Sequence, residues 1–529
     1  MQSKGARRDF LKLAGITGAA LSVPAVTGTA KAAENENGGG YFDVKAFGAK
    51  GDGKTLDTDA INKAIEAAAA AGGGTVRFPA GDYLSYSIHL KSKVALYLGQ
   101  GATIVAADSP TTAGPGYDEA EPNQWSKYQD FGHSHWHNSL IWGEGLSDIA
   151  ILGPGRIWGK GLSRGVGQPR AEIKGVGNKS IGLKNCHNVT LRDFSILHGG
   201  HFGILATGVD NFTIDNLKID TNRDGMDIDC CRNVRVSNCS VNSPWDDAIC
   251  LKSCYALGSA KPTEFVTITN CYVAGGFEEG TLLDGTYKVA GPGYRVSHTG
   301  RIKCGTESNG GFKNITISNC VFEKCQGLAL ETVDGALLED VTITNITMRD
   351  IVTAPIFLRL GARMRAPEGT PIGTLRRVII SNIACSNSSA RISSIISGIP
   401  GHEIEDVKIS NIQVLHEGGG TKENAAIQPP ERENGYPEPT MFGTMPANGF
   451  YVRHVKGIEM SNIEIIAAKE DFRPTFVFND VQDIDCSHIK ASKTPDVPAF
   501  SLNNVTDFRL HMSQAAPDTV LDKVDQKTI

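Results

Sequence analysis

The chain has 529 residues, 40% of them hydrophobic and 21% charged, with a formal net charge of −6 at pH 7. This composition supports a large folded core, and length alone would suggest several domains. No basic run is visible, which argues against nucleic-acid binding. An acidic polymer as partner would therefore require local Lys and Arg side chains rather than a basic protein overall.

The first 32 residues have the pattern of an export signal. Arg7-Arg8 precedes a mildly apolar, Gly/Ala-rich stretch from Leu13 to Val26, and Ala30-Lys31-Ala32 offers a small-residue cleavage site. The pattern is typical of a twin-arginine signal peptide and is too short and glycine-rich for a membrane span. We expect residues 1–32 to be removed and the mature protein to be periplasmic or extracellular. The alternative is a disordered basic tail.

A strand with a glycine-rich turn is predicted over 41–53, followed by a helix over 57–70 and another strand over 75–83. Asp57-Thr58-Asp59 is a typical helix start, and Gly72 to Gly74 end the helical pattern. We expect this short helix to cap the N-terminal end of the structure that follows, whose exposed strand edges would otherwise invite aggregation.

A six-residue phrase then recurs through most of the chain, roughly every 22 to 26 residues where no insertion intervenes. It alternates β-branched and polar residues and is punctuated by Asn and Gly. These features predict an all-β fold, a single parallel β-helix (solenoid) whose coils stack about 4.8 Å apart. The copies are Asn188–Asp193, Asn211–Asn216, Asn233–Asn238, Phe265–Asn270, Asn314–Asn319, Asp340–Asn345, Arg377–Asn382, Asp406–Asn411 and Gly457–Asn462.

The twelve cysteines invite a disulfide interpretation in an exported protein, but their positions argue against a full set. Cys186, Cys239, Cys271 and Cys320 each follow an Asn. This predicts an interior stack of small apolar side chains.

Three acidic residues stand about one coil apart. Asp224 lies in Asn222–Asp229, and Asp246 and Asp247 lie in the next coil. Stacking of coils would bring the three carboxylates together on one face, which indicates acid/base chemistry. The alternative is that they merely decorate turns, as Asp often does.

His133-Ser134-His135-Trp136-His137 places three imidazoles on one face if the segment is extended. No fourth ligand is evident, so we take His135 as a substrate contact at a cleft rim, with a metal site or a structural role as the alternatives. We expect no metal and no cofactor in the protein as a whole. Irregular stretches over 275–300 and 418–448 are expected to form loops that narrow the binding cleft.

Four motifs follow in order: Asn222-Arg223-Asp224, Asp246-Asp247, Ser297-His298-Thr299-Gly300 and Arg301-Ile302-Lys303. They resemble the pattern of the polygalacturonase family of pectin-degrading enzymes, glycoside hydrolase family 28, which reads Asn-Thr-Asp, Asp-Asp, Gly-His-Gly and Arg-Ile-Lys. The resemblance covers nearly everything from Phe42 to about Asn504. It implies a right-handed, pectin-lyase-like β-helix in which residues 33–529 form one catalytic domain.

The fourth motif departs from the family, because Arg301-Ile302-Lys303 stands one coil too early. By coil count the family motif falls on Ala329-Leu330-Glu331, so that Glu331 would replace a substrate-binding cation. Arg301 and Lys303 would then contact substrate from the neighbouring coil. With Asn222, these three residues are the predicted substrate-binding set, and a displaced positive clamp puts plain polygalacturonate in question as the substrate.

The resemblance implies inverting hydrolysis of a pectic or related uronic-acid or rhamnose-containing polysaccharide. Asp246 is the expected general acid, Asp224 and Asp247 the water-activating pair, and His298 a hydrogen-bonding member of the same network. The loop over 275–300 suggests a closed, exo-acting site. Two alternatives remain: a polysaccharide lyase using Arg301 with Ca²⁺ on Asp227 and Asp229, and a non-catalytic carbohydrate-binding protein.

Overall fold

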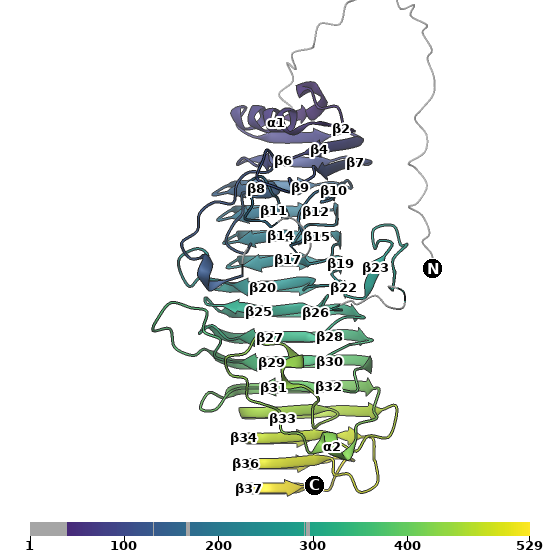
Figure 1. Cartoon of the computed structure of the whole chain (residues 1–529). Coiled ribbons are helices and arrows are strands. Elements are labelled where there is room, and N and C mark those ends of the chain that lie inside the picture. Colours follow the sequence, from purple (N-terminus) through teal and green to yellow (C-terminus); the bar gives the residue numbers. More distant parts are fainter. Residues whose placement is uncertain (1–39, 131, 166–169, 290, 292–296) are drawn as a thin grey trace, which may run out of the picture. The chain divides into compact units, whose positions relative to one another are not determined.

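In the computed structural model, residues 40–529 are described, except for 131, 166–169, 290 and 292–296. The predicted signal peptide lies outside the described residues. The described part contains one sheet of 35 strands wound as a β-helix, which confirms the predicted fold class (Figure 1). No helix among these residues has the length and apolar character needed to cross a membrane.

Each coil contributes three strands, and each strand pairs in parallel with its counterpart on the next coil. The first-strand column contains β5 (Ile88–His89), β8 (Ser139–Glu144), β11 (Lys179–Lys184), β14 (Phe202–Thr207), β17 (Asp224–Asp229), β20 (Ile249–Ser253), β25 (Ile302–Ser308), β27 (Leu328–Thr332), β29 (Ile356–Leu360) and β31 (Ser394–Ser397). The second contains β1 (Tyr41–Asp43), β3 (Gly74–Phe78), β6 (Val94–Leu98), β9 (Ser147–Leu152), β12 (His187–Arg192), β15 (Asp210–Asp215), β18 (Arg232–Ser237) and β21 (Thr263–Thr269). The third contains β2 (Asp52–Leu56), β4 (Gly81–Ser85), β7 (Ala102–Ala106), β10 (Arg156–Trp158), β13 (Ser195–Leu197), β16 (Lys218–Asp220), β19 (Ser240–Asn242) and β22 (Tyr272–Ala274).

Toward the C-terminus the strands of one coil merge into longer ones, which keep left-handed turn residues such as Asn319 and Asn345, with φ of 55° and 57°. They are β26 (Phe312–Glu323), β28 (Leu337–Arg349), β30 (Thr374–Ser388), β32 (Ile404–His416), β33 (Phe450–Ala467), β34 (Phe476–Ser487) and β36 (Phe500–His511). The two-residue strand β35 (Lys490–Ala491) stays separate and pairs with β33. The final strand, β37 (Thr519–Thr528), pairs antiparallel with β36.

The six-residue phrase forms the second strand and its two flanking turns. Asn211 and Asn216 bound one copy with φ of 59° and 54°, and Asn233 and Asn238 bound the next with 56° and 57°. This left-handed conformation is costly for most residues and is tolerated best by Asn, Asp and Gly. It explains why Asn and Gly recur at the ends of the six-residue phrase. Between the turns, alternate side chains such as Phe212 point into the core.

The helix α1 (Thr58–Ala70) confirms the predicted N-terminal cap, with Ile61, Ala64, Ile65 and Ala68 buried against the first coils (Figure 1). The Asp57 carboxylate does not cap it. That carboxylate instead accepts hydrogen bonds from the backbone N–H of Lys50 and Gly51, at 2.6 and 2.9 Å, and so holds the preceding turn.

All twelve cysteines are buried with free thiols. Cys239, Cys271 and Cys320 do stack on successive coils, as the strand register shows. Including Cys186 in this stack was wrong, because its register places it beside Val209 and Cys231 in a different column. An Asn precedes Cys186 just as it precedes the three stacked cysteines, so the local Asn-Cys pattern did not distinguish the two columns.

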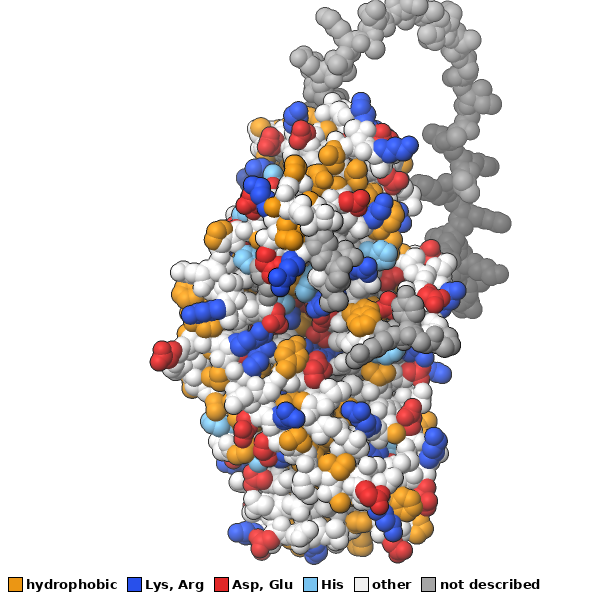
Figure 2. All heavy atoms as spheres, viewed as in Figure 1, with side chains coloured by type: hydrophobic (Ala, Val, Ile, Leu, Met, Phe, Trp, Pro, Cys, Tyr) orange, Lys and Arg blue, Asp and Glu red, His pale blue; other side chains and the backbone are white. Residues whose placement is uncertain are grey.

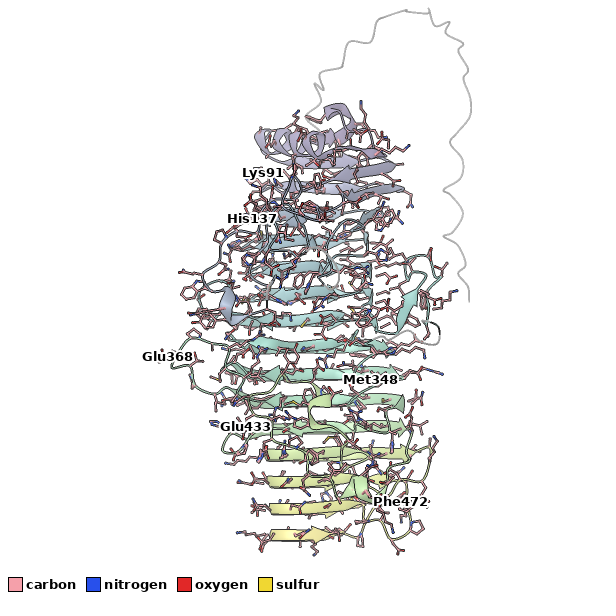
Figure 3. The ribbon with its side chains drawn as sticks, viewed as in Figure 1. Lys91, His137, Met348, Glu368, Glu433 and Phe472 are labelled. Atoms are coloured by element: carbon pink, nitrogen blue, oxygen red, sulfur yellow. The ribbon has the colours of Figure 1, made fainter. Side chains whose placement is uncertain are left out.

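The turn that leads from the third strand to the first carries the large insertions, over 107–138, 159–178, 275–301 and 417–449. They contain the short elements η2 (Ser126–Tyr128), the hairpin β23–β24 (Phe277–Glu279 and Lys288–Val289), α2 (Lys422–Ala425) and η3 (Pro439–Phe442). Glu433, in the last insertion, lies at the edge of the stack, where its carbonyl accepts from Ala362 (Figure 3). On the face shown in Figure 2, acidic and basic side chains are interspersed rather than gathered into one patch.

Candidate active site

The structure brings together the three aspartates singled out by coil spacing. Asp224 begins β17, and Asp246 and Asp247 end the turn before β20. The register pairs Met226 with Ile249, so the carboxylates meet across neighbouring coils. One oxygen from each of the three lies within 4.8 Å of the others. All three belong to the turn column that carries the insertions.

Asp247 is held as a carboxylate by two cations. Arg301 Nε donates to its Oδ1 at 2.9 Å, and Lys303 Nζ lies 3.2 Å from its Oδ2. Burial alone would raise the pKa of Asp247, but Lys303 and Arg301 lower it to about 2. Asp247 is therefore ionised at any working pH of a carbohydrate-active enzyme.

Asp246 and Asp224 are shifted in the opposite direction. Burial and the neighbouring Asp247 raise the pKa of Asp246, although Arg223 Nη2 lies 2.7 Å from its Oδ2. Burial, followed by Asp227 and Asp246, raises the pKa of Asp224 well above its usual value. The Asp246 side chain is 26% exposed, whereas those of Asp224 and Asp247 are 4% and 2% exposed. Asp246 is thus the most exposed member of the trio, and its pKa is raised while that of Asp247 is lowered.

Arg301 and Lys303 lie on the same face as the acids but are only 0% and 2% exposed. Lys303 pairs with Cys250 on one side and with Ala329 on the other, so Ala329-Leu330-Glu331 is indeed one coil later. Glu331 Oε2 lies 3.7 Å from Lys303 Nζ. Burial raises the pKa of Glu331 to about 7, against the lowering effect of the two cations.

A further acidic partner of Arg301 comes from the 417–449 insertion and was missed by sequence reasoning. Glu438 Oε1 accepts from Arg301 Nη2 at 2.7 Å, and Gln326 Oε1 accepts from Nη1 at 2.6 Å. In the same insertion, Tyr436 lies within hydrogen-bonding distance of Thr306, at 3.0 Å. The guanidinium is therefore fully engaged within the protein. No local motif marks Glu438, which is 137 residues from Arg301 along the chain.

His298 does not join the acid network as predicted. Among the described residues, it has no recorded hydrogen bond to the three aspartates, and it lies instead against the backbone of Lys324 and Gly275. Burial lowers its pKa, so the imidazole is neutral near pH 7. Asn222 does lie beside the trio, where its carbonyl accepts from the backbone N–H of Trp245 at 2.8 Å.

The three histidines of the 133–137 segment have separate partners. His133 Nε2 lies 3.1 Å from Asp227 Oδ2, and His137 stacks on Trp142 at 3.9 Å. His135 is buried with its Nδ1 2.7 Å from the carbonyl oxygen of Glu121, which does not fit the predicted contact at an exposed rim. The segment therefore does not present one imidazole face.

Two groups among the described residues have ligand atoms close enough for a metal ion: the aspartate trio, and Asp229 with Cys230 and Cys254. In the second group, Cys254 Sγ donates to Asp229 Oδ2 at 2.7 Å, and burial raises the pKa of Asp229. The protonated thiols already satisfy this carboxylate. In the first group, Arg301 and Lys303 already pair with Asp247, and Arg223 pairs with Asp246.

Comparisons with known proteins agree with this picture. Residues 41–134 match the family described as "Rhamnogalacturonase A/epimerase, pectate lyase-like", and residues 169–361 match "Right handed beta helix region". A probable polygalacturonase of Vitis vinifera is 23% identical over 397 residues, covering 70% of this chain and 73% of the relative. Alginate lyase 7 of Azotobacter vinelandii is 53% identical over 66 residues, which span 12% of this chain and only 8% of that protein. The family 28 exopolygalacturonase of Yersinia enterocolitica has the same fold, with a TM-score of 0.58 at 20% identity over 88% of this chain and 78% of that structure.

The right-handed β-helix and the similarity to polygalacturonases support an enzyme of the glycoside hydrolase type. Within that class, the chain is polygalacturonase-like, which confirms the resemblance drawn from its motifs.

Proposed function

We propose that this protein is an exported, exo-acting hydrolase that cleaves pectic or related uronic-acid or rhamnose-containing polysaccharides with inversion at the anomeric carbon. One observation carries the proposal: three adjacent carboxyl groups whose pKa values are driven apart. The pKa of Asp247 is lowered to about 2, while that of Asp246 is raised. Hydrolysis of a glycosidic bond needs one carboxylate and one carboxylic acid at the same site.

In the proposed reaction, Asp246 donates its proton to the leaving glycosidic oxygen. Asp247 accepts a proton from the attacking water, and Asp224 hydrogen-bonds the same water. Inverting enzymes commonly separate the acid and base by about 6.5–9.5 Å. The nearest oxygens here are within 4.8 Å, so the attacking water must lie among the three carboxyl groups rather than between two opposed ones.

The lyase alternative fits the geometry poorly. A lyase base must be able to lose its proton, yet the carboxylates around Lys303 and Arg301 raise the pKa of both side chains despite burial. The acids proposed for Ca²⁺ are also engaged, since Asp227 pairs with His133 and Asp229 accepts from Cys254. The intact acid trio likewise disfavours a purely binding role.

Two insertions that reach the strand face from opposite ends support exo action. From the N-terminal side, the 107–138 insertion brings His133 to Asp227 on β17. From the C-terminal side, the 417–449 insertion brings Glu438 to Arg301, next to β25. Both insertions would restrict the length of polysaccharide that can lie in the site. The Vitis vinifera relative is named a polygalacturonase, which supports a pectic substrate.

Product analysis of the mature protein on homogalacturonan and rhamnogalacturonan oligosaccharides tests this proposal. We expect saturated products released from one chain end, and at least about a 100-fold lower turnover for Asp246→Asn, the usual contribution of a general acid. Asp522→Asn, an exposed aspartate on β37, is the matched control and should be fully active. An unsaturated uronide product, or near-normal activity of Asp246→Asn, would refute it.

A further inference from the structure

The residue directly before the acid pair is an exposed aromatic. Trp245 has 41% of its surface accessible and is the only one of the five tryptophans, all of them in the described part of the chain, that is classed as exposed. Trp136 is fully buried, and Trp142 is covered by the stacked ring of His137. Single exposed hydrophobic side chains are common, but this one directly precedes Asp246, so its ring is available to a ligand bound at the acid pair.

The backbone that carries Trp245 is fixed on both sides. Its N–H donates to the Asn222 carbonyl at 2.8 Å on the preceding coil. On the following coil, Thr299 N–H donates to the Pro244 carbonyl at 3.2 Å, and Gly300 N–H donates to the backbone carbonyl of Asp246 at 2.9 Å. The turn is therefore held by hydrogen bonds from the coils above and below, which fix the backbone of Trp245 beside Asp246.

The indole lies beside the 275–301 insertion. Burial raises the pKa of Glu278, on β23, and the Trp245 side chain acts to lower it, so the two side chains are close. The hairpin is in turn anchored to the coils, because Asn242 Nδ2 donates to the Phe277 carbonyl at 2.7 Å and Leu282 N–H donates to the Asp220 carboxylate at 2.8 Å. The ring of Trp245 keeps an exposed apolar surface beside this hairpin.

We propose that Trp245 is a sugar-stacking platform: its exposed ring packs against the apolar face of a pyranose whose glycosidic oxygen is presented to Asp246, and Glu278 positions the indole. The proposal deepens the proposed function, on which it rests. It assigns the β23–β24 insertion a role in binding, since the insertion supplies the group that orients the ring. Rigid aromatic rings with one polar edge bind sugars in this way because the C–H face of the sugar is apolar while its hydroxyl groups stay hydrated.

Binding without turnover is the direct test. Asp246→Asn is used as the parent, and isothermal titration calorimetry measures its affinity for homogalacturonan and rhamnogalacturonan oligosaccharides. Adding Trp245→Leu should weaken binding by about tenfold or more, whereas adding Trp245→Phe should restore affinity to within about threefold of the parent. Trp158→Phe, on β10, is the matched control for loss of a tryptophan and should bind as the parent does. Adding Glu278→Ala should give an intermediate loss, with the thermal midpoint unchanged.

Equal affinity of the parent and the Trp245→Leu variant would overturn the proposal, and so would a parent that binds none of these oligosaccharides. A Trp245→Phe variant as weak as Trp245→Leu would also contradict it, because stacking requires only an aromatic ring. Product release by Asp246→Asn tests the proposed catalytic role of Asp246 separately from binding. If Asp246→Asn still releases product while Trp245→Leu loses affinity, the acid assignment is wrong and the platform stands.

Discussion

Replacing Lys303 with Gln tests how the site keeps Asp247 ionised. Lys303 Nζ lies 3.2 Å from Asp247 Oδ2, a separation at which two unit charges attract by about 5 kcal/mol at an effective dielectric constant of about 20. Arg301 Nε, at 2.9 Å, remains in the variant, so only part of the stabilisation is lost. Loss of one close cation commonly changes the pKa of a carboxyl group by about 1–3. We therefore expect the pKa of Asp247 to rise from about 2 into the range of an ordinary carboxyl group.

The assay is kcat/KM for product release between about pH 2 and pH 8, which reports the pKa values of the free enzyme. A carboxylate with a depressed pKa loses its charge only as the pH falls through that value. Wild-type activity should therefore persist to strongly acidic pH and decline as the pH rises through the raised pKa of Asp246. In Lys303→Gln the acidic limb of the pH profile of kcat/KM should move to higher pH by about one unit or more, while its basic limb should move less.

Lys408→Gln is the matched control, because Lys408 pairs with Glu459 at 2.7 Å on the exposed outer surface, with side chains 62% and 51% accessible. Such surface pairs contribute little, so neither limb should move. An acidic limb in Lys303→Gln that coincides with that of wild type would refute the argument that Lys303 sets the charge of Asp247.

Two further predictions concern specificity and stability. Glu438→Gln removes the carboxylate that engages Arg301, so kcat/KM on unesterified oligogalacturonides should rise several-fold relative to methyl-esterified ones, and an unchanged ratio would contradict internal neutralisation of this cation. Ile268→Ala deletes a fully buried core side chain on β21 and should lower the free energy of unfolding by about 2–5 kcal/mol, measured by urea denaturation; the outward-facing Ile379→Ala, at an exposed position on β30, should cost far less.

Most of the coil architecture was predictable because its causes are local. Alternating β-branched residues define the strands, and the Asn that bound them occupy left-handed turns, as at Asn211 and Asn216. The meeting of Asp224 with Asp247 followed from the coil length alone. Repetition does not determine how insertions fold, which is why Glu438 and the position of His298 were not predicted. The Cys186 register was wrong because two different turns share the same Asn-Cys pattern.

The central claim is that Asp246 protonates the glycosidic oxygen while a water activated by Asp247 attacks the anomeric carbon. Time-resolved proton NMR of the first product formed from a pectic oligosaccharide tests it most directly. We predict a newly formed reducing end of the configuration opposite to that of the cleaved linkage, appearing before mutarotation and absent with Asp246→Asn. Retention of configuration, or the same product from the Asp246→Asn variant, would contradict the account.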